Sequence, residues 1–60
     1  MEQLLSIKEV AGILGVHPMT IYDMTYYKQI EYVKVGGRKL IKKSTLENYI
    51  EENTVRREVI

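Results

Sequence analysis

Residues 6–22 read SIKEVAGILGVHPMTIY, and this stretch decides the fold. Ser6 followed three residues later by Glu9 is the pattern of a capping box, so we expect a helix to begin after Ser6. Gly15 suits the left-handed backbone position that ends a helix. Pro18 suits the first position of a helix, where its missing N–H group costs nothing. The stretch therefore predicts two helices separated by a short turn that contains a glycine.

Each of these two helices is expected to have an apolar face. In the first helix apolar residues recur at helical spacing, at Ile7, Val10, Ala11 and Leu14. The second helix is expected to run from residue 18 to residue 27 or 28, with Ile21 and Met24 on its inner face. Two short helices joined in this way form a helix-turn-helix, a motif that can place its second helix in the major groove of DNA.

A β-hairpin is predicted after the second helix. Residues 32–35 and 38–41 are rich in β-type residues, and the pair Gly36-Gly37 between them predicts a primed two-residue turn. A lone hairpin is marginal in water, so its apolar residues are expected to pack on the helices. These residues are Val33, Val35 and either Leu40 or Ile41, whereas the outward face of the hairpin is basic.

A third helix is predicted from a second capping-box pattern, with Ser44 as its N-cap and Glu47 three residues later. Its inner face is expected to carry Leu46, Tyr49 and Ile50. The expected fold is mostly α-helical with one small β-hairpin, in the order helix, helix, hairpin, helix, which is a winged helix-turn-helix. We expect one DNA-binding domain over residues 4–53, followed at residues 54–60 by a tail, a linker or a helix extension.

Composition argues against several classes of protein. The 60 residues include no cysteine and one histidine, so we expect no disulfide, no metal site and no cofactor. No apolar run approaches the roughly 18 residues of a membrane span, and no signal-peptide core is evident, so a cytoplasmic protein is expected. No spacing resembles a nucleophile with its base, and so short a chain has little room for a water-excluding pocket. An enzyme is therefore not expected.

Positive charge is concentrated in one block of a nearly neutral chain. The formal net charge is +1, but residues 28–43 hold six cations against one acid. Such a block is the electrostatic footprint of a nucleic-acid-binding surface. A solvated basic loop is the alternative.

Two segments carry a resemblance to a known family: LLSIKEVAGILGVHPMTIY (4–22) and VKVGGRKLIKKSTLENYI (33–50). They resemble the excisionase-family DNA-binding domain, a winged helix-turn-helix related to the MerR regulators. The resemblance implies sequence-specific binding of double-stranded DNA in an excisionase-like recombination factor or a small transcriptional regulator. The DNA-binding head of a plasmid partition protein is an alternative role. The chain departs from the family pattern at His17, at Asp23 and in the turn at residues 28–29, which usually contains a glycine.

The candidate DNA-binding residues fall in the second helix and in the hairpin. Thr20 and Met19 are expected to reach base edges, with packing of the Thr20 hydroxyl against the first helix as the alternative. The hydroxyl groups of Tyr22 and Tyr26 are expected to hold phosphates, with packing of one of the two in the core or against the hairpin as the alternative. Arg38 is expected in a minor groove, and the nearby lysines on phosphates. The full set is His17, Pro18, Met19, Thr20, Tyr22, Tyr26, Lys34, Gly37, Arg38 and Lys39.

Three neighbouring residues have less certain roles. His17 can cap the second helix or contact DNA, and the two roles remain open. Asp23 is expected to face away from DNA or to accept from a cytosine amino group. Tyr27 is expected to lie partly buried against the hairpin.

Self-association is expected because one small winged domain contacts few base pairs. The copies could bind side by side on DNA, or they could associate through sequence beyond residue 60 if the chain is the head of a longer protein. A protein–protein adaptor is the rival interpretation from another class, because exposed tyrosines and methionines also mark protein interfaces.

Overall fold

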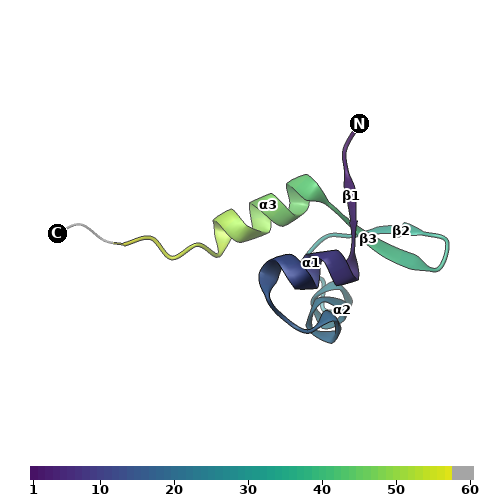
Figure 1. Ribbon diagram of the computed structural model, residues 1–60, viewed down its shortest axis with the longest axis horizontal. Coiled ribbons are helices and arrows are strands. Elements are labelled where there is room, and N and C mark those ends of the chain that lie inside the picture. Colours follow the sequence, from purple (N-terminus) through teal and green to yellow (C-terminus); the bar gives the residue numbers. More distant parts are fainter. Residues whose placement is uncertain (58–60) are drawn as a thin grey trace.

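The computed structural model describes residues 1–57 and confirms the predicted winged helix-turn-helix class (Figure 1). Its elements, in chain order, are β1 (Leu4–Ser6), α1 (Ile7–Leu14), α2 (Pro18–Tyr26), β2 (Val33–Val35), β3 (Arg38–Lys42) and α3 (Lys43–Glu52). Helices α1 and α2 pack together below the sheet in Figure 1, and the β2–β3 hairpin projects away from α3. This hairpin, residues 33–42, is called the wing below.

Local signals set both ends of α1 as predicted. The Ser6 side chain accepts from the backbone N–H of Glu9, and the Glu9 carboxylate accepts from the backbone N–H of Ser6. Gly15 ends the helix in the left-handed region, with φ of 70°. Gly12 lies inside α1, and a Cβ added there would meet nothing within 4 Å. No packing among residues 1–57 therefore requires a glycine at that position.

Helix α2 ends one to two residues earlier than predicted, at Tyr26. Lys28 follows with φ of 57°, a left-handed conformation that a side chain disfavours. The backbone N–H of Lys28 donates to the carbonyl of Thr25, and that of Gln29 donates to the carbonyl of Met24. These two bonds form a Schellman motif, which usually places a glycine where this chain has Lys28.

The sheet has one strand more than the sequence predicts. Strand β3 lies in the centre, paired antiparallel with β1 on one side and with β2 on the other. Val35 faces Arg38 across the turn, and Gly36 has φ of 60° while Gly37 has no positive φ. A positive φ at the first turn position alone fits the type II′ member of the predicted primed class.

The predicted capping box of α3 is wrong. Helix α3 begins at Lys43, one residue before Ser44, and its N-cap Lys42 makes no side-chain cap hydrogen bond. The pairing of Leu4 with Lys42 carries strand β3 directly into the helix, so Ser44 falls in the first turn. The carboxylate of Glu2 caps the helix instead, accepting from the backbone N–H of Ser44 at 2.8 Å.

Glu2 therefore joins the start of the chain to the start of α3. Hydrogen bonds from Ser44, helped by the charges of Lys42 and Lys43, hold the pKa of the Glu2 carboxyl below its usual range. The carboxylate form is the one that caps the helix. The contact therefore stabilises the folded chain at pH values above the usual pKa range of glutamate.

The core lies between the sheet and the three helices. Its fully enclosed apolar side chains include Val10, Ile21 and Ile41, one from each of α1, α2 and β3. The complete buried apolar set is Leu5, Ile7, Val10, Ala11, Ile21, Met24, Ile30, Ile41 and Leu46, with Leu14 and Tyr49 packed against it. Two core predictions are wrong: Val35 is exposed because it lies near the tip of the projecting wing, and Ile50 is exposed on α3.

The segment after α3 is not helical over residues 54–57. The Thr54 hydroxyl donates to the Ile50 carbonyl, and Arg56 forms an ion pair with Glu51. The remainder of the tail expected from the sequence, residues 58–60, lies outside the described residues. Over residues 1–57 the structure contains no helix that is long and apolar enough to cross a membrane.

Candidate nucleic-acid interface

The turn between α1 and α2 fixes the start of the second helix. Nδ1 of His17 accepts from the backbone N–H of Met19 at 3.1 Å, and the His17 carbonyl accepts from the backbone N–H of Thr20 at 2.9 Å. The capping role of His17 is therefore present in the structure. This contact engages Nδ1, while the histidine as a whole remains exposed at the helix N-terminus.

The outward face of α2 carries most of the candidate residues of the helix. The buried side is formed by Ile21, Met24 and Thr25. The opposite side exposes Met19, Thr20, Tyr22, Asp23 and Tyr26, whereas Pro18 is half-buried. Tyr26 is 74% exposed and Met19 is 58% exposed, although neither is a charged residue. Large apolar side chains that stay in water on one helix face mark a surface for a partner.

Tyr27 does not lie against the wing as expected. It is 68% exposed, and its ring meets the Tyr26 ring edge-on with the centroids 5.0 Å apart. The left-handed turn at Lys28 redirects the chain immediately after this residue, so Tyr27 stays with the exposed end of α2.

The wing places its cations near the turn. Lys34, Gly37 and Arg38 are all exposed, and Lys34 pairs with Lys39 across the two strands. A Cβ added at Gly37 would meet nothing within 4 Å, so the wing itself leaves open space at that position. Near its turn the wing therefore offers the cations of Lys34 and Arg38 and an unobstructed backbone.

Lys39 differs from Lys34, its partner across the two strands. Its ammonium nitrogen donates to the hydroxyl of Thr25 at 3.1 Å and lies 4.9 Å from the centre of the Tyr32 ring. The Thr25 hydroxyl, in a residue 1% exposed, donates in turn to the carbonyl of Tyr22 at 2.7 Å. Lys39 therefore links the wing to α2, and its ammonium group contacts Thr25 and Tyr32.

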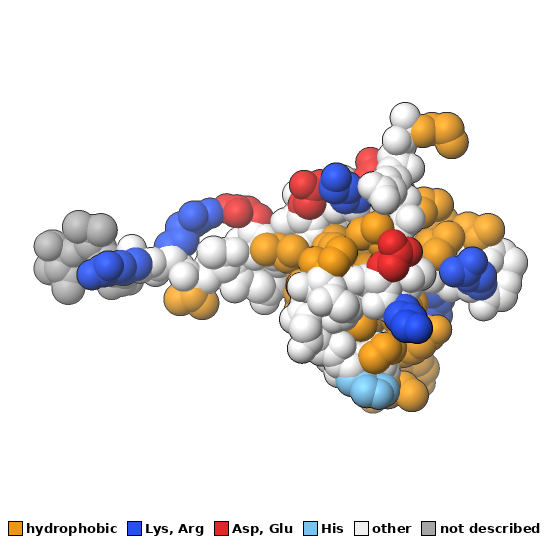
Figure 2. All heavy atoms as spheres, viewed as in Figure 1, with side chains coloured by type: hydrophobic (Ala, Val, Ile, Leu, Met, Phe, Trp, Pro, Cys, Tyr) orange, Lys and Arg blue, Asp and Glu red, His pale blue; other side chains and the backbone are white. Residues whose placement is uncertain are grey.

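A groove brings α1, α2 and the wing together. It has a volume of about 300 Å³, and its lining includes Lys8 from α1, Tyr22 from α2, and Gly37, Arg38 and Lys39 from the wing. Figure 2 shows hydrophobic side chains gathered over the α1–α2 part of the molecule, with cationic side chains among and beside them. Lys8 was not among the residues predicted from the sequence. It lies in the first turn of α1, and only the tertiary packing brings that turn beside the wing.

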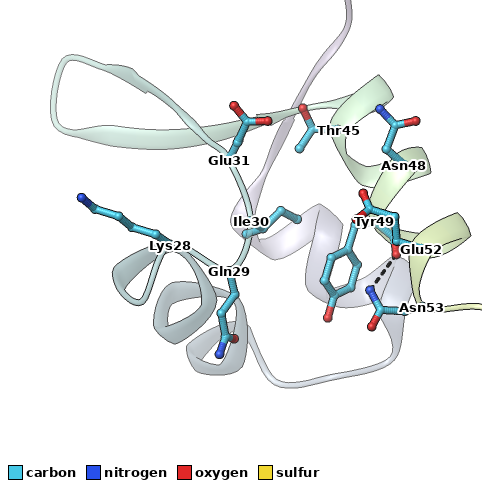
Figure 3. A pocket seen from close by; sticks show the side chains of 9 residues that line it. All are labelled: Lys28, Gln29, Ile30, Glu31, Thr45, Asn48, Tyr49, Glu52 and Asn53. Carbon is cyan, nitrogen blue, oxygen red and sulfur yellow. Dashed lines mark hydrogen bonds between the residues drawn. The ribbon is translucent and has the colours of Figure 1, made fainter.

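A larger hollow, of about 570 Å³, lies elsewhere, between the α2–β2 loop and α3 (Figure 3). Its walls carry acids and amides, including Glu31, Asn48 and Glu52, with Lys28 as the one cation in its lining. The Asn53 side chain donates to the Tyr49 carbonyl at its edge. The acidic side chains of this hollow would repel the negatively charged backbone of a nucleic acid.

Within residues 1–57 no three histidine, cysteine or acidic side chains are grouped so that they could hold a metal ion. Every buried side-chain nitrogen or oxygen described there has a hydrogen-bond partner. No orphaned polar group therefore points to an absent ligand in the core.

Comparison with known proteins gives one match. A family model described as "Helix-turn-helix domain" matches residues 4–54, which include every element of the fold and the whole of the candidate interface. No curated protein and no solved structure gives a significant match.

Proposed function

The chain belongs to this helix-turn-helix domain family, and on that premise we propose that it binds double-stranded DNA in a sequence-specific manner. In this proposal α2 enters the major groove, and the wing contacts the backbone or an adjacent minor groove. The contacting residues are His17, Pro18, Met19, Thr20, Tyr22, Tyr26, Lys34, Gly37 and Arg38. Lys8 joins them because it lines the same groove as Arg38.

The groove between α1, α2 and the wing is the single observation that carries this proposal. Lys8, Tyr22 and Arg38 come from three different elements and line one concave surface. A phosphate backbone running along this surface would meet two cations and one phenol hydroxyl, the kinds of groups that commonly contact DNA phosphates. The exposed face of α2 would then lie beside that backbone, where base edges are within reach.

Lys39 has a supporting role in this proposal. The sequence led us to expect a phosphate contact from it, but its ammonium group is held between Thr25 and Tyr32. We infer that it fixes the angle between the wing and α2, so that both elements can contact the same DNA duplex at once.

The biological role rests on the resemblance to excisionase-family domains. We propose an excisionase-like recombination factor or a small transcriptional regulator, with the DNA-binding head of a plasmid partition protein as the alternative. In each role several copies would bind neighbouring sites, because a single module buries only about 600–1,000 Å² on DNA.

Selection of binding sites from a random duplex pool tests the proposal, followed by binding at two salt concentrations. With about three to five phosphate contacts, affinity should fall about 40- to 500-fold between 50 and 200 mM salt. Arg38→Ala should weaken binding and flatten this salt dependence, whereas Thr20→Ala should relax base preference at particular positions by about 1–3 kcal/mol.

Arg56→Ala is the matched control, because it removes the same charge from an exposed arginine paired with Glu51 outside the groove. It should leave both affinity and salt dependence nearly unchanged. If wild-type protein retains no duplex even at low salt, the DNA-binding proposal fails. The exposed tyrosines and methionine of α2 then favour the adaptor alternative.

A further inference from the structure

The exposed face of α2 lacks the side chains that read purines by paired hydrogen bonds. Arginine or lysine recognises guanine in this way, and asparagine or glutamine recognises adenine. Helix α2 contains none of these four residue types from Pro18 to Tyr26. A helix of this composition must distinguish base pairs by other means.

The same face is rich in large side chains with apolar surface. Met19 and Tyr26 are the most exposed side chains of this kind within α2, and Tyr22 lies beside them, also exposed. The thymine C5-methyl is the apolar group that the major groove offers, and apolar side chains recognise it by direct contact. Burying that methyl group against Met19 or Tyr26 would remove apolar surface of both partners from water.

Asp23 adds a hydrogen-bond acceptor to the apolar side chains on this face of α2. It follows Met19 by four residues and precedes Tyr26 by three, so all three share one face of the helix. Its carboxylate can accept from the amino group of adenine or cytosine, but it meets only acceptors on the major-groove edge of guanine. A thymine–adenine pair alone presents a methyl group and an amino donor together.

Resting on the proposed function, we propose that α2 selects thymine–adenine pairs by methyl contact. Met19 and Tyr26 contact the thymine C5-methyl groups, and Asp23 accepts from the adenine amino group. Affinity comes mainly from the cations of the groove and wing, and base selection comes from a helix that carries no cation of its own.

The test replaces thymine by uracil, which removes the C5-methyl group and leaves the hydrogen-bonding edges in place. Each thymine of a selected site is changed singly in synthetic duplexes, and binding is measured by fluorescence anisotropy. Uracil should weaken binding about fourfold at each contacted position, and about 16-fold where two methyl groups are lost together. Met19→Ala or Tyr26→Ala should abolish the difference between thymine and uracil at one such position.

Ile13→Ala is the matched control, because Ile13 on α1 is 58% exposed, the same fraction as Met19. It should leave the thymine preference intact. Specific binding that is indifferent to uracil at every position would overturn methyl reading while leaving the proposed function standing. Methyl reading is also overturned if both α2 variants keep the full preference. Failure to retain any duplex would instead remove the proposed function together with this inference.

Discussion

The contact between Lys39 and Thr25 should stabilise the domain measurably. Thr25→Val keeps the side-chain volume but removes a hydrogen bond to the Tyr22 carbonyl and one from the Lys39 ammonium. A neutral hydrogen bond contributes about 0.5–1.5 kcal/mol and one to a charged group about 1.5–3 kcal/mol. Because Lys39 is only half-buried, we take the low end of these ranges and expect a loss of about 2 kcal/mol in unfolding free energy. In a domain of this size that loss lowers the Tm by about 8–16 °C.

A double-mutant cycle isolates the contact itself. Thr25→Val, Lys39→Met and the double variant are unfolded in urea and followed by circular dichroism. The double variant should lose about 1.5 kcal/mol less than the sum of the single variants, because each single change already breaks the shared hydrogen bond. Additive losses, within about 0.3 kcal/mol, would refute the link between wing and helix.

Lys34→Met is the matched control, since Lys34 faces Lys39 across the two strands but is exposed. Its unfolding free energy should change by less than about 0.5 kcal/mol.

The effects of the two lysines on DNA binding should be the reverse of their effects on stability. Lys34→Met should reduce the slope of log affinity against log salt by about 0.9, whereas Lys39→Met should leave that slope unchanged. An equal reduction from both variants would place Lys39 on a phosphate.

Three further substitutions test features of the backbone and the caps. Lys28→Gly should raise stability by about 1 kcal/mol in urea unfolding, because it relieves a left-handed side-chain residue, and a loss would contradict the Schellman turn. Gly12→Ala should add about 0.5–1 kcal/mol, since the added methyl group meets open space inside a helix, and a lower Tm would show that this space is occupied. Glu2→Gln should flatten the dependence of stability on pH. The lowered pKa of Glu2 means that its contribution is present above the usual glutamate range and is lost as pH falls through the folded value. If the curves of unfolding free energy against pH stay parallel for wild type and variant through the usual glutamate range, Glu2 does not cap α3.

The sequence predicts those parts of the fold that local chemistry determines. The capping box at Ser6, the glycine that ends α1 and the proline that begins α2 each act within a few residues. The two-glycine turn of the wing is equally local. These signals place the helix-turn-helix and the wing without knowledge of any long-range contact.

The missed features depend on segments far apart in the chain. Three residues, Leu4 to Ser6, are too few to show a strand period, and they become a strand only by pairing with β3. That pairing also decides where α3 begins, so a capping pattern at Ser44 is overridden by Glu2, 42 residues away. Local sequence cannot reveal such an exchange of caps.

The candidate site shows the same division. The exposed residues of α2 and the cations of the wing follow from helical spacing and from the charge block. The engagement of Lys39 by Thr25 and the presence of Lys8 in the groove follow only from tertiary packing. A lysine in a sequence looks the same whether its charge faces solvent or a buried hydroxyl group.

An NMR titration of the isotopically labelled chain with a selected duplex tests most directly whether α2 and the wing form the DNA-binding surface. Amide shifts should concentrate at Lys8, along residues 17–27 and in the wing at residues 34–38. The acidic positions of α3, at Glu47, Glu51 and Glu52, should remain nearly unchanged. Shifts centred instead on α3 and on the hollow lined by Glu31 and Asn48 would contradict the assignment of α2 and the wing as the DNA-binding surface.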